Sequence, residues 1–369
     1  MRELYLGLIS GTSMDGVDAV LAEISDSLCQ IQRAQTTAFP SSLAERLRRL
    51  VEVPQTSLAE LGALDHALGR FFAACSLELI EKSGFKTTDI TAIGHHGQTV
   101  FHEPRGSEPF SMQIGDPNIV AATTGITTVA DFRRLDMAHG GQGAPLMPAF
   151  HAWRFRAPEE TRVVLNIGGI ANTTVLDRSH APTGLDTGPG NTLLDLWVRR
   201  CRNQAYDRDG GWAASGNVNA ALLDSFLDEP FFAAPAPKST GRELFNMDWI
   251  DRHLAAVGRP ADADVQATLA ELTAATIATA IARSVERCQR IIVCGGGAHN
   301  VDLMARLTRL THSNVESSAA FQIPPDWVEG AGFAWLARAR LKRIAGNLPS
   351  VTGARRPAIL GGVYWGGTP

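Results

Sequence analysis

The sequence lacks the features that mark several specialised classes of protein. Its 369 residues include 5 cysteines, which are scattered and have no metal-binding spacing: Cys29, Cys75, Cys201, Cys288 and Cys294. An odd, unpatterned set indicates reduced thiols, so we expect a cytoplasmic protein with neither a disulfide framework nor a zinc site. No apolar run approaches the ~20 residues that span a bilayer. The chain also opens without a basic segment and cleavage site, so we expect neither a membrane span nor a secretory signal.

A strong charge of one sign is also missing. The formal net charge of −4 at pH 7 gives no support to a nucleic-acid partner or an anionic membrane surface. Apolar residues make up 44% and charged residues 20%, which is ordinary for a globular protein. A chain of 369 residues is long enough for about two domains.

The chain is instead rich in glycine at predicted turns, and the first of these follows the apolar segment Leu4–Ile9. Apolar residues resume at Val17–Leu21, which predicts a strand, a tight turn and a second strand. Glycine lets backbone N–H groups approach a ligand closely, and a curled run of N–H groups binds anions. Asp15 and Asp18 would repel a bare phosphate but suit one that carries Mg²⁺. The turn is a candidate phosphate loop, with an ordinary polar hairpin turn as the alternative.

A second glycine turn opens the other half of the chain with the same pattern. The apolar strand Val163–Ile167 leads into Gly168 and Gly169, and Asn172 precedes an apolar return at Val175. Two such hairpins, one at the start of each half, indicate an internally duplicated fold with a phosphate turn from each side.

Helix signals lie between these turns. Ser42 with Glu45, and Ser57 with Glu60, match the capping box that starts a helix. An Ala- and Thr-rich segment predicts a long helix from about Asp264 to Arg287. A short final strand within 358–364 is expected to pack back on the first domain.

Polar residues follow a short buried strand predicted at Ile90–Ile93. The residues His95 and His96 come next, where the strand is expected to end. Ligand contacts in α/β proteins lie at such strand ends. Satisfied turn histidines are the plainer interpretation.

A pair of arginines follows the next predicted strand. Either Arg133 or Arg134 could hold a carboxylate in a bidentate fork. The alternative is a surface ion pair with Asp131 or Asp136. A long Gly-rich stretch without predicted helix follows, and such loops are usually functional.

Two further sites stand at predicted strand ends in the second half. Asp186 is expected at the end of a short strand before a helix, a place for a functional carboxylate, with a capping or turn aspartate as the alternative. Three consecutive glycines, Gly295–Gly297, follow another apolar strand. They would let a base or ribose lie on the backbone, although a plain tight turn would use them as well.

Several of these motifs, taken together in chain order, form one recognisable pattern. They are Gly11–Asp18, His96–Thr99, Asp131–Arg133 with Gly140–Pro145, Asn166–Asn172, Asp186–Asn191 and Pro237–Glu243. In order and spacing, over nearly the whole chain, they resemble the anhydro-N-acetylmuramic acid kinase family. Each motif alone is weak, but the combination is highly specific. One position departs from the pattern, because a larger residue than Gly330 is expected after Glu329.

The resemblance implies an α/β fold of the sugar kinase, actin and heat-shock chaperone superfamily. Two domains, each a mixed sheet with flanking helices, would hold ATP in a cleft between them. The first domain would span residues 1–135 and 345–369, and the second 136–344. The implied cofactors are ATP and the Mg²⁺ that it carries, with the metal near Asp15 or Asp18. The implied partners are small molecules, and a homodimer is expected.

The resemblance also implies roles for individual residues. Those expected to bind the nucleotide are Gly11, Thr12, Ser13, Met14, Asp15, Gly16, Val17, Asp18, Asn166, Gly168, Gly169, Asn172, Gly295, Gly296, Gly297 and Asn300. Those expected to bind the sugar are Ser13, Gln98, Arg133, Asp186 and Glu329. Asp186 would be the catalytic base and Glu329 an assisting carboxylate.

The implied reaction joins hydrolysis to phosphoryl transfer. A 1,6-anhydro sugar has no free 6-hydroxyl, so water must open the ring as O6 takes the γ-phosphoryl group, and a carboxylate must accept a proton. The products would be N-acetylmuramic acid 6-phosphate and ADP. A conventional sugar kinase and a non-catalytic ATP-driven clamp of the same superfamily are the alternatives.

Overall fold

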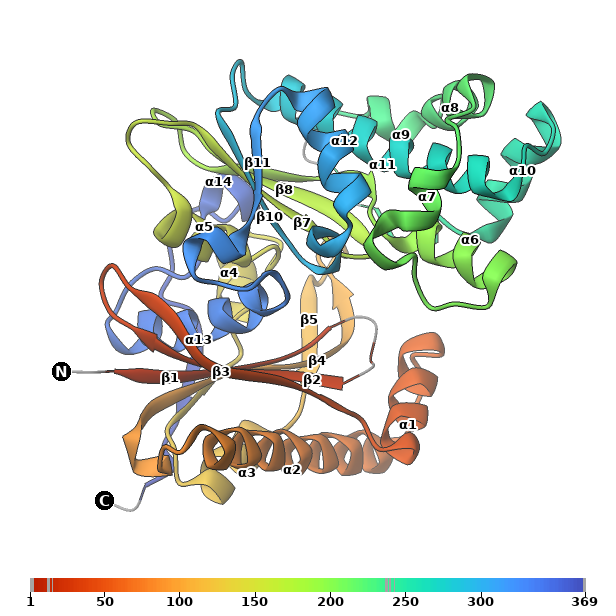
Figure 1. Ribbon diagram of the computed structural model, residues 1–369. Helices are drawn as coiled ribbons and strands as arrows, with labels where there is room; N and C mark the ends of the chain where they lie inside the picture. The colour runs from red at the N-terminus through yellow and green to blue at the C-terminus, as the bar shows by residue number, and fades with distance from the viewer. Residues whose placement is uncertain are drawn as a thin grey trace. The chain divides into compact units, whose positions relative to one another are not determined.

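The computed structural model of the chain describes residues 3–11, 14, 16–235, 238, 240–241 and 243–367. It divides into two compact units (Figure 1), unit 1 (Met1–Arg154 with Trp327–Pro369) and unit 2 (Phe155–Asp326). These boundaries differ from the expected 135/136 and 344/345. The reason is packing between segments far apart in the sequence, since the rings of Phe150 and Trp335 lie 6.1 Å apart and join their two helices within unit 1.

Unit 1 contains a mixed sheet with the strand order β12-β6-β4-β1-β2-β3, and β5 pairs with β4 at one end. β1, β2 and β3 form an antiparallel meander, while β4 is parallel to β1 and β6 is parallel to β4. The strands are β1 (Leu4–Ser10), β2 (Gly16–Ile24), β3 (Cys29–Ala38), β4 (Ile90–Glu103), β5 (Phe110–Ile114), β6 (Thr128–Ala130) and β12 (Gly362–Tyr364).

Unit 2 repeats this arrangement in the order β11-β10-β7-β8-β9. β7, β8 and β9 form an antiparallel meander, β10 is parallel to β7, and β11 is parallel to β10. The strands are β7 (Arg162–Ile167), β8 (Ile170–Leu176), β9 (Thr183–Pro189), β10 (Arg290–Cys294) and β11 (Asn314–Ser317). The prediction of an internally duplicated α/β fold is therefore confirmed.

Helices complete each unit (Figure 1). In unit 1 they are α1 (Ser41–Glu52), α2 (Leu58–Ser83), α3 (Pro117–Thr124), α4 (Arg134–Ala138), α5 (Met147–Phe155, whose last residue belongs to unit 2), α13 (Val328–Leu341) and α14 (Pro349–Thr352). In unit 2 they are α6 (Thr192–Arg202), α7 (Gly211–Ser215), α8 (Ala220–Leu227), α9 (Pro230–Ala233), α10 (Met247–Val257), α11 (Asp262–Ser284) and α12 (Val301–Thr311). The short 3-10 helices are Thr87–Asp89, Arg208–Gly210, Gly296–His299, Ser318–Phe321 and Pro325–Trp327.

The central strand β1 separates two packed layers in unit 1. Side chains alternate between the faces of a strand. Leu6 and Leu8 therefore join the apolar core that contains Phe72 of α2, while Gly7 between them faces α13. A methyl group at Gly7 would overlap the carbonyl oxygen of Gly330, so α13 approaches the strand at backbone distance.

The same close packing explains the glycine that departs from the family pattern. A methyl group at Gly330 would overlap the side chain of Val20 on β2, and one at Gly94 of β4 would overlap the backbone of Phe333. A residue larger than Gly330 would force α13 away from the sheet. This packing places Glu329, in the first turn of α13, at a defined position over the strands.

Several local predictions are confirmed and others are corrected. Ser57 caps α2 by accepting a hydrogen bond from the N–H of Glu60, but α1 begins one residue before Ser42, after Pro40, without a side-chain cap. The strand predicted at Ile90–Ile93 extends to Glu103, because β5 supplies a further partner beyond the end of β1. The final strand is confirmed as β12, which pairs with β6 in unit 1.

Among the described residues, one helix is long and apolar enough to cross a membrane by length and composition alone. It is α11, whose most apolar window has a mean hydropathy of 1.3, although no such segment was expected from the sequence. About 78% of that window is buried inside the protein, and Ala274, Ile277 and Ile281 pack against the sheet of unit 2. These contacts are those of a core helix.

Candidate functional site

The first glycine turn joins β1 to β2 and is held by Gln98 of β4. The buried Oε1 of Gln98 accepts a hydrogen bond from the Ser10 hydroxyl at 2.6 Å, and Nε2 donates to the carbonyl of Thr99 at 3.1 Å. The N–H of Met14 donates to the carbonyl of Gly11 at 3.2 Å. Thr12, Ser13 and Asp15, which were expected to bind nucleotide or sugar, lie outside the described residues.

The other predicted residues of this turn lie on β2, and Asp18 stands opposite Ile9 in the β1–β2 pairing. Gly16 and Val17 are buried at the start of β2. The Asp18 carboxylate accepts a hydrogen bond from the Thr36 hydroxyl at 2.6 Å. It also acts electrostatically on Glu329 of α13. The structure thus brings together two acidic residues that are 311 positions apart in the sequence numbering, from 18 to 329.

Glu329 reaches solvent from the first turn of α13. Protein atoms nevertheless replace much of the water around its carboxyl group, and this desolvation raises its pKa above the usual range. Asp18 raises the pKa further by charge repulsion, whereas Arg133 acts in the opposite direction. Glu329 and Arg133 are therefore electrostatic neighbours, as the expected sugar site requires.

The two candidate arginines have different environments. Arg134 forms an ion pair with Asp131 at 2.8 Å, and its side chain is 66% exposed. Arg133 instead donates from Nε and one terminal nitrogen to Nε2 of His96, at 3.2 and 2.8 Å, and from the other to the carbonyl of Gly143 at 2.9 Å. Burial lowers the pKa of Arg133 to about 10, so the guanidinium is charged at neutral pH.

His96 is suited to this contact because it is neutral. Burial, and then the charge of Arg133, hold its pKa well below the usual range. Its Nδ1 lies 2.9 Å from the carbonyl of Gly97, which assigns the proton to Nδ1 and leaves Nε2 as the acceptor for Arg133. His95 points elsewhere and contacts the carbonyl of Gly115 at 2.6 Å. The two histidines therefore have separate roles, a core contact for His95 and an arginine contact for His96.

The second glycine turn, between β7 and β8, is held by the start of α6. The carbonyl of Gly168 accepts a hydrogen bond from the N–H of Asn191 at 2.8 Å, and that of Gly169 accepts from Gly190 and Thr192 at 2.9 and 3.1 Å. The backbone of this turn is thus fixed by the backbone that follows β9.

The Asn166 side chain lies beside the three consecutive glycines. A methyl group at Gly295, where φ is +77°, would overlap the side-chain oxygen of Asn166. Gly297 packs just as closely on Ile167. Asn166 pairs with Asn172 across the β7–β8 hairpin. The structure therefore brings the second turn and the glycine loop together within unit 2.

Asp186 lies in the middle of β9, not at the strand end that was expected. The strand continues to Pro189 because β8 pairs with it along its length. The Asp186 carboxylate accepts a hydrogen bond from the N–H of Thr240 at 3.1 Å, and its own N–H donates to the carbonyl of Lys238 at 3.2 Å. Burial raises the pKa of Asp186, against the lowering effects of the Thr240 N–H and the Lys238 charge.

Lys238 and Thr240 were not singled out from the sequence. They belong to the quoted motif Pro237–Glu243, so the motif itself was the available signal. The ammonium group of Lys238 donates to the carbonyls of Phe231 and Phe232, at 2.9 and 3.2 Å, and lies 4.5 Å from the centre of the Phe231 ring. These contacts fix the Lys238 side chain.

Unit 2 also contains a cavity of about 540 Å³. Two residues expected to bind nucleotide, Gly296 and Asn300, line it, whereas Gly295 and Gly297 are not among its lining residues. The side chain of Asn300 is also engaged in capping α12, since its Oδ1 accepts from the N–H of Leu303 at 2.9 Å. The remaining lining residues are Asn191, Leu194, Asp195, Tyr206, Asp207, Arg208, Asp209 and His299.

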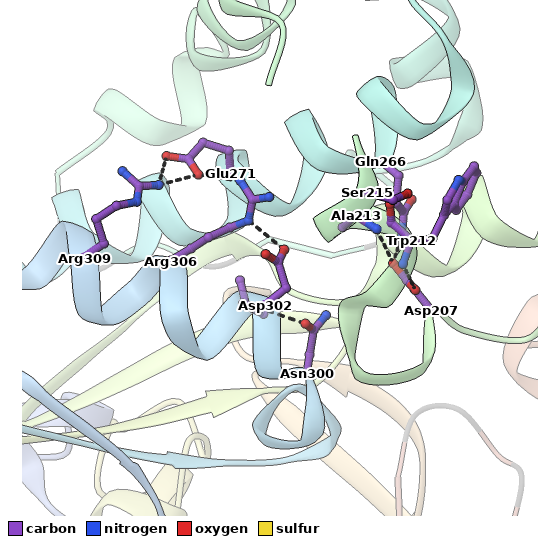
Figure 2. Close-up of polar contacts among 11 residues, drawn as sticks. Asp207, Trp212, Ala213, Ser215, Gln266, Glu271, Asn300, Asp302, Arg306 and Arg309 are labelled. Carbon is purple, nitrogen blue, oxygen red and sulfur yellow. Dashed lines mark hydrogen bonds and ion pairs between the residues drawn. The ribbon is translucent and has the colours of Figure 1, made fainter. Parts of the chain in front are cut away.

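Asp207 and Asp209 form an acidic wall of the cavity, which the sequence motifs did not single out. Figure 2 shows that the Asp207 carboxylate is occupied by donors from α7 and α11. It accepts from the N–H groups of Trp212 and Ala213, both at 2.9 Å, and from Nε2 of Gln266 at 3.3 Å. Asp207 therefore shapes the wall, while Asp209 offers a second carboxylate in the same lining.

Charged side chains hold the helix that follows Asn300 (Figure 2). Glu271 of α11 accepts from Arg306 at 2.8 Å and from Arg309 at 2.7 Å, both on α12. Arg306 also binds Asp302 at 2.7 Å. Glu271 and Arg306 are largely shielded from solvent, so this network fixes the cavity wall to the core helix of unit 2.

Comparison with known proteins shows the family to which this chain belongs. A model of the family described as anhydro-N-acetylmuramic acid kinase matches residues 3–366. A protein named anhydro-N-acetylmuramic acid kinase from Pasteurella multocida is 49% identical over 362 residues, which covers 98% of this chain and 96% of that protein. One of the same name from Vibrio cholerae is 50% identical over 366 residues, which covers 99% of each.

A solved structure, the activator of the 2-hydroxyisocaproyl-CoA dehydratase from Clostridium difficile, aligns with a TM-score of 0.49 at 13% identity. The alignment covers 93% of this chain and 96% of that one. A likeness of this degree carries no functional argument.

Proposed function

Because this chain belongs to the anhydro-N-acetylmuramic acid kinase family, we propose that it opens 1,6-anhydro-N-acetylmuramic acid with water and phosphorylates O6 with ATP. The oxygen of water forms a bond to C1 as the bond between C1 and O6 breaks. O6 takes the γ-phosphoryl group, ADP leaves, and one proton of the water passes to a base. The products are N-acetylmuramic acid 6-phosphate and ADP, which places the enzyme in peptidoglycan recycling.

Asp186 is the base in this proposal. Its carboxylate is half-buried. Burial raises its pKa above that of an ordinary aspartate and so toward neutral pH. A general base acts best when its pKa lies near the working pH and its position is fixed. The strand β9 and the N–H of Thr240 provide that fixed position. This geometry is the observation that most supports the assignment.

The lactyl carboxylate of the sugar is bound by Arg133. Its hydrogen bonds go to two neutral acceptors, His96 and the Gly143 carbonyl, so no carboxylate contact neutralises it among the described residues. A guanidinium held in this way retains its charge for an anionic ligand. Glu329 assists from the same unit by its charge, and Gln98 positions the first turn through the Ser10 hydroxyl.

ATP occupies the cavity of unit 2 through its nucleoside, against Gly296 and Asn300. The glycine turn at Gly168 and Gly169, with Asn166 and Asn172 beside it, supplies backbone near the phosphates. Gly11, Met14 and Gly16 belong to the first phosphate turn in unit 1. Glycine at positions 11, 168 and 169 permits the close approach that a phosphate needs.

The residues near the first turn suit a phosphate-borne Mg²⁺. Asp18 and Glu329 repel each other, which is the arrangement that an added cation relieves. Mg²⁺ is usually bound through one or two carboxylates and the substrate phosphates. Within the described residues no group of three or more His, Cys, Asp or Glu side chains could hold a metal. Bound Mg²⁺ would offset the charge of the transferring phosphoryl group, and it would lie near Asp15 or Asp18.

Turnover in ¹⁸O-water tests the proposed reaction. Ring opening by water should place the label in the sugar of the product and none in its phosphate. Because a reducing sugar exchanges its C1 oxygen with water, unlabelled N-acetylmuramic acid 6-phosphate incubated for the same time is the control. A clamp would instead label free phosphate and turn over ATP without the anhydrosugar. A conventional kinase would prefer the open-ring sugar.

A homodimer is a further expectation from the family resemblance, and a cytoplasmic location is the expectation from the scattered cysteines. Sedimentation equilibrium of the purified chain would measure the oligomeric state. A monomer at all concentrations tested would contradict the dimer and leave the proposed reaction untouched.

A further inference from the structure

Asp136 is a buried carboxylate that has no role in the reaction described above. It lies in α4 with 0% of its surface exposed. Its Oδ2 accepts a hydrogen bond from the N–H of Gly143 at 2.8 Å. Its Oδ1 accepts from the Asn347 amide at 2.6 Å and from the Thr352 hydroxyl at 2.7 Å. The carboxylate thus joins the glycine loop to two segments from the far end of the chain.

The loop is shaped around this carboxylate. A methyl group at Gly141 would overlap the Asp136 side chain, and the N–H of Gly141 donates to the carbonyl of Asp136 at 3.0 Å. Gly143 has a φ of +70°, and a methyl group there would lie 2.8 Å from Met137. These glycines therefore let the loop fold back over α4 and present the N–H of Gly143 to Asp136.

The other side of the loop faces Arg133. Gly143 donates its N–H to Asp136, and its carbonyl accepts from Arg133 at 2.9 Å. A single residue thus connects the buried carboxylate to the arginine. The second acceptor of Arg133, His96, belongs to β4 and makes no contact with this loop among the hydrogen bonds of the described residues.

We propose that Asp136 is a positioning residue for the sugar site, which acts through the Gly143 peptide to aim Arg133 at the lactyl carboxylate. This inference rests on the proposed function, because it requires Arg133 to bind the sugar. Asp136 itself touches no substrate. Its carboxylate is an acceptor only, so it accepts from three donors that converge on it.

Asp136→Asn is the sharpest perturbation, because an amide keeps the size of the side chain but replaces one acceptor by a donor. In one orientation the new NH2 group faces the N–H of Gly143, and in the other it faces the amide NH2 of Asn347, so a donor meets a donor in both. Loss of a buried hydrogen bond to a charged group should raise the KM for the anhydrosugar by roughly 5- to 100-fold, with a smaller change in kcat. The KM for ATP should stay within about 2-fold of wild type, since the arginine contacts no nucleotide in this proposal.

Asp131→Asn is the matched control. It changes a neighbouring aspartate whose partner is the exposed Arg134, and asparagine tolerates the positive φ of +61° at this position. Its kinetic constants should match wild type. Thr352→Val provides a milder second variant, which removes one donor to Asp136 and leaves Gly143 bound. It should raise the sugar KM less than Asp136→Asn does.

A double-mutant cycle distinguishes positioning from general stabilisation. In an Arg133→Ala background, Asp136→Asn should raise the sugar KM no further, because the group it aims is gone. An equal multiplication of KM in both backgrounds would overturn the inference, as would an unchanged KM in Asp136→Asn alone. If Asp136→Asn does not fold, the same cycle is run with Thr352→Val, and equal multiplication has the same meaning.

The positioning role of Asp136 and the sugar role of Arg133 are tested separately. If Arg133→Ala raises the sugar KM but the Asp136 and Thr352 variants do not, only the positioning role is overturned. If Arg133→Ala leaves the sugar KM unchanged, the sugar role of Arg133 falls and the inference falls with it. The reaction itself stands or falls separately on the ¹⁸O measurement.

Discussion

The two carboxylates expected to act on the sugar, Glu329 and Asp186, are held in different ways. Glu329 lies in the first turn of a helix that packs at backbone distance on glycines of the sheet, and it faces charges of both signs, Asp18 and Arg133. Asp186 lies in mid-strand and is contacted by a loop, through the N–H of Thr240 and the cation of Lys238. The first carboxylate faces charges of both signs, while the second faces one cation and accepts one backbone hydrogen bond.

This difference supports the proposed division of roles between the two carboxylates. The pKa values of both carboxyl groups are raised by loss of water around them. Protonation of Glu329 would also remove its repulsion of Asp18 and its attraction to Arg133. Its charge is therefore suited to organising the site. Protonation of Asp186 removes the proton acceptor itself, together with the charge that faces Lys238. The comparison therefore favours Asp186 as the base and Glu329 as the assisting charge.

The largest effect is expected from Asp186→Asn. The amide keeps the size of the side chain but cannot accept the proton of water, and general-base catalysis is typically worth ~100- to 10,000-fold. Turnover should fall by that order for ring opening and ADP formation together, while binding of sugar and ATP, measured by calorimetry, changes little.

Asp177→Asn is the control for that variant, because Asp177 is a carboxylate outside the proposed site, held by the N–H groups of Ser179 and His180 beyond the end of β8. It should retain wild-type turnover. An Asp186→Asn enzyme with near-normal turnover would remove Asp186 from the chemistry and make Glu329 the next candidate base.

A smaller loss is expected from Glu329→Gln. The substitution removes the charge that faces Arg133 and Asp18 but leaves α13 in place, and charged contacts of this kind are worth roughly 10- to 100-fold in rate. Steady-state kinetics with both substrates would measure it. A loss as large as that of Asp186→Asn would mean that Glu329 takes part in proton transfer, and the distinction between the two carboxylates would be wrong.

Lys238→Met should change the pH profile more than the maximum rate. The Lys238 cation stabilises the Asp186 carboxylate and so lowers its pKa, against the larger effect of burial. Removing the cation should raise that pKa, and since the base must be unprotonated, the acid limb of kcat/KM should move to higher pH. A profile that moves to lower pH, or not at all, would show that Lys238 does not act on Asp186 by its charge.

The smallest effect is expected from Arg134→Ala. Its ion pair with Asp131 is exposed, and such pairs contribute ~0–1 kcal/mol. The sugar KM and kcat should both stay within about 2-fold of wild type, in contrast to Arg133→Ala. A selective loss of sugar affinity in Arg134→Ala would reverse the assignment of the two neighbours.

Local sequence was sufficient for the repeated strand–turn–strand pattern and the cap at Ser57. These features depend on torsional preference, periodicity and capping, all of which act within a few residues. The same local signals failed at Ser42 and at the end of β4, where the neighbouring Pro40 and the distant partner β5 decide the outcome. A strand ends where its partners end, which periodicity does not encode.

The tertiary structure alone distinguished Arg133 from Arg134, since the two share one local sequence and only packing places the first against His96 and Gly143. It likewise brought Lys238 and Thr240 to Asp186, and Asn347 and Thr352 to Asp136. Motifs in the sequence supplied the chemistry of the candidate site residues. Their partners come from segments tens to hundreds of residues away, because burial and hydrogen-bond satisfaction are properties of the packed chain and of no single segment.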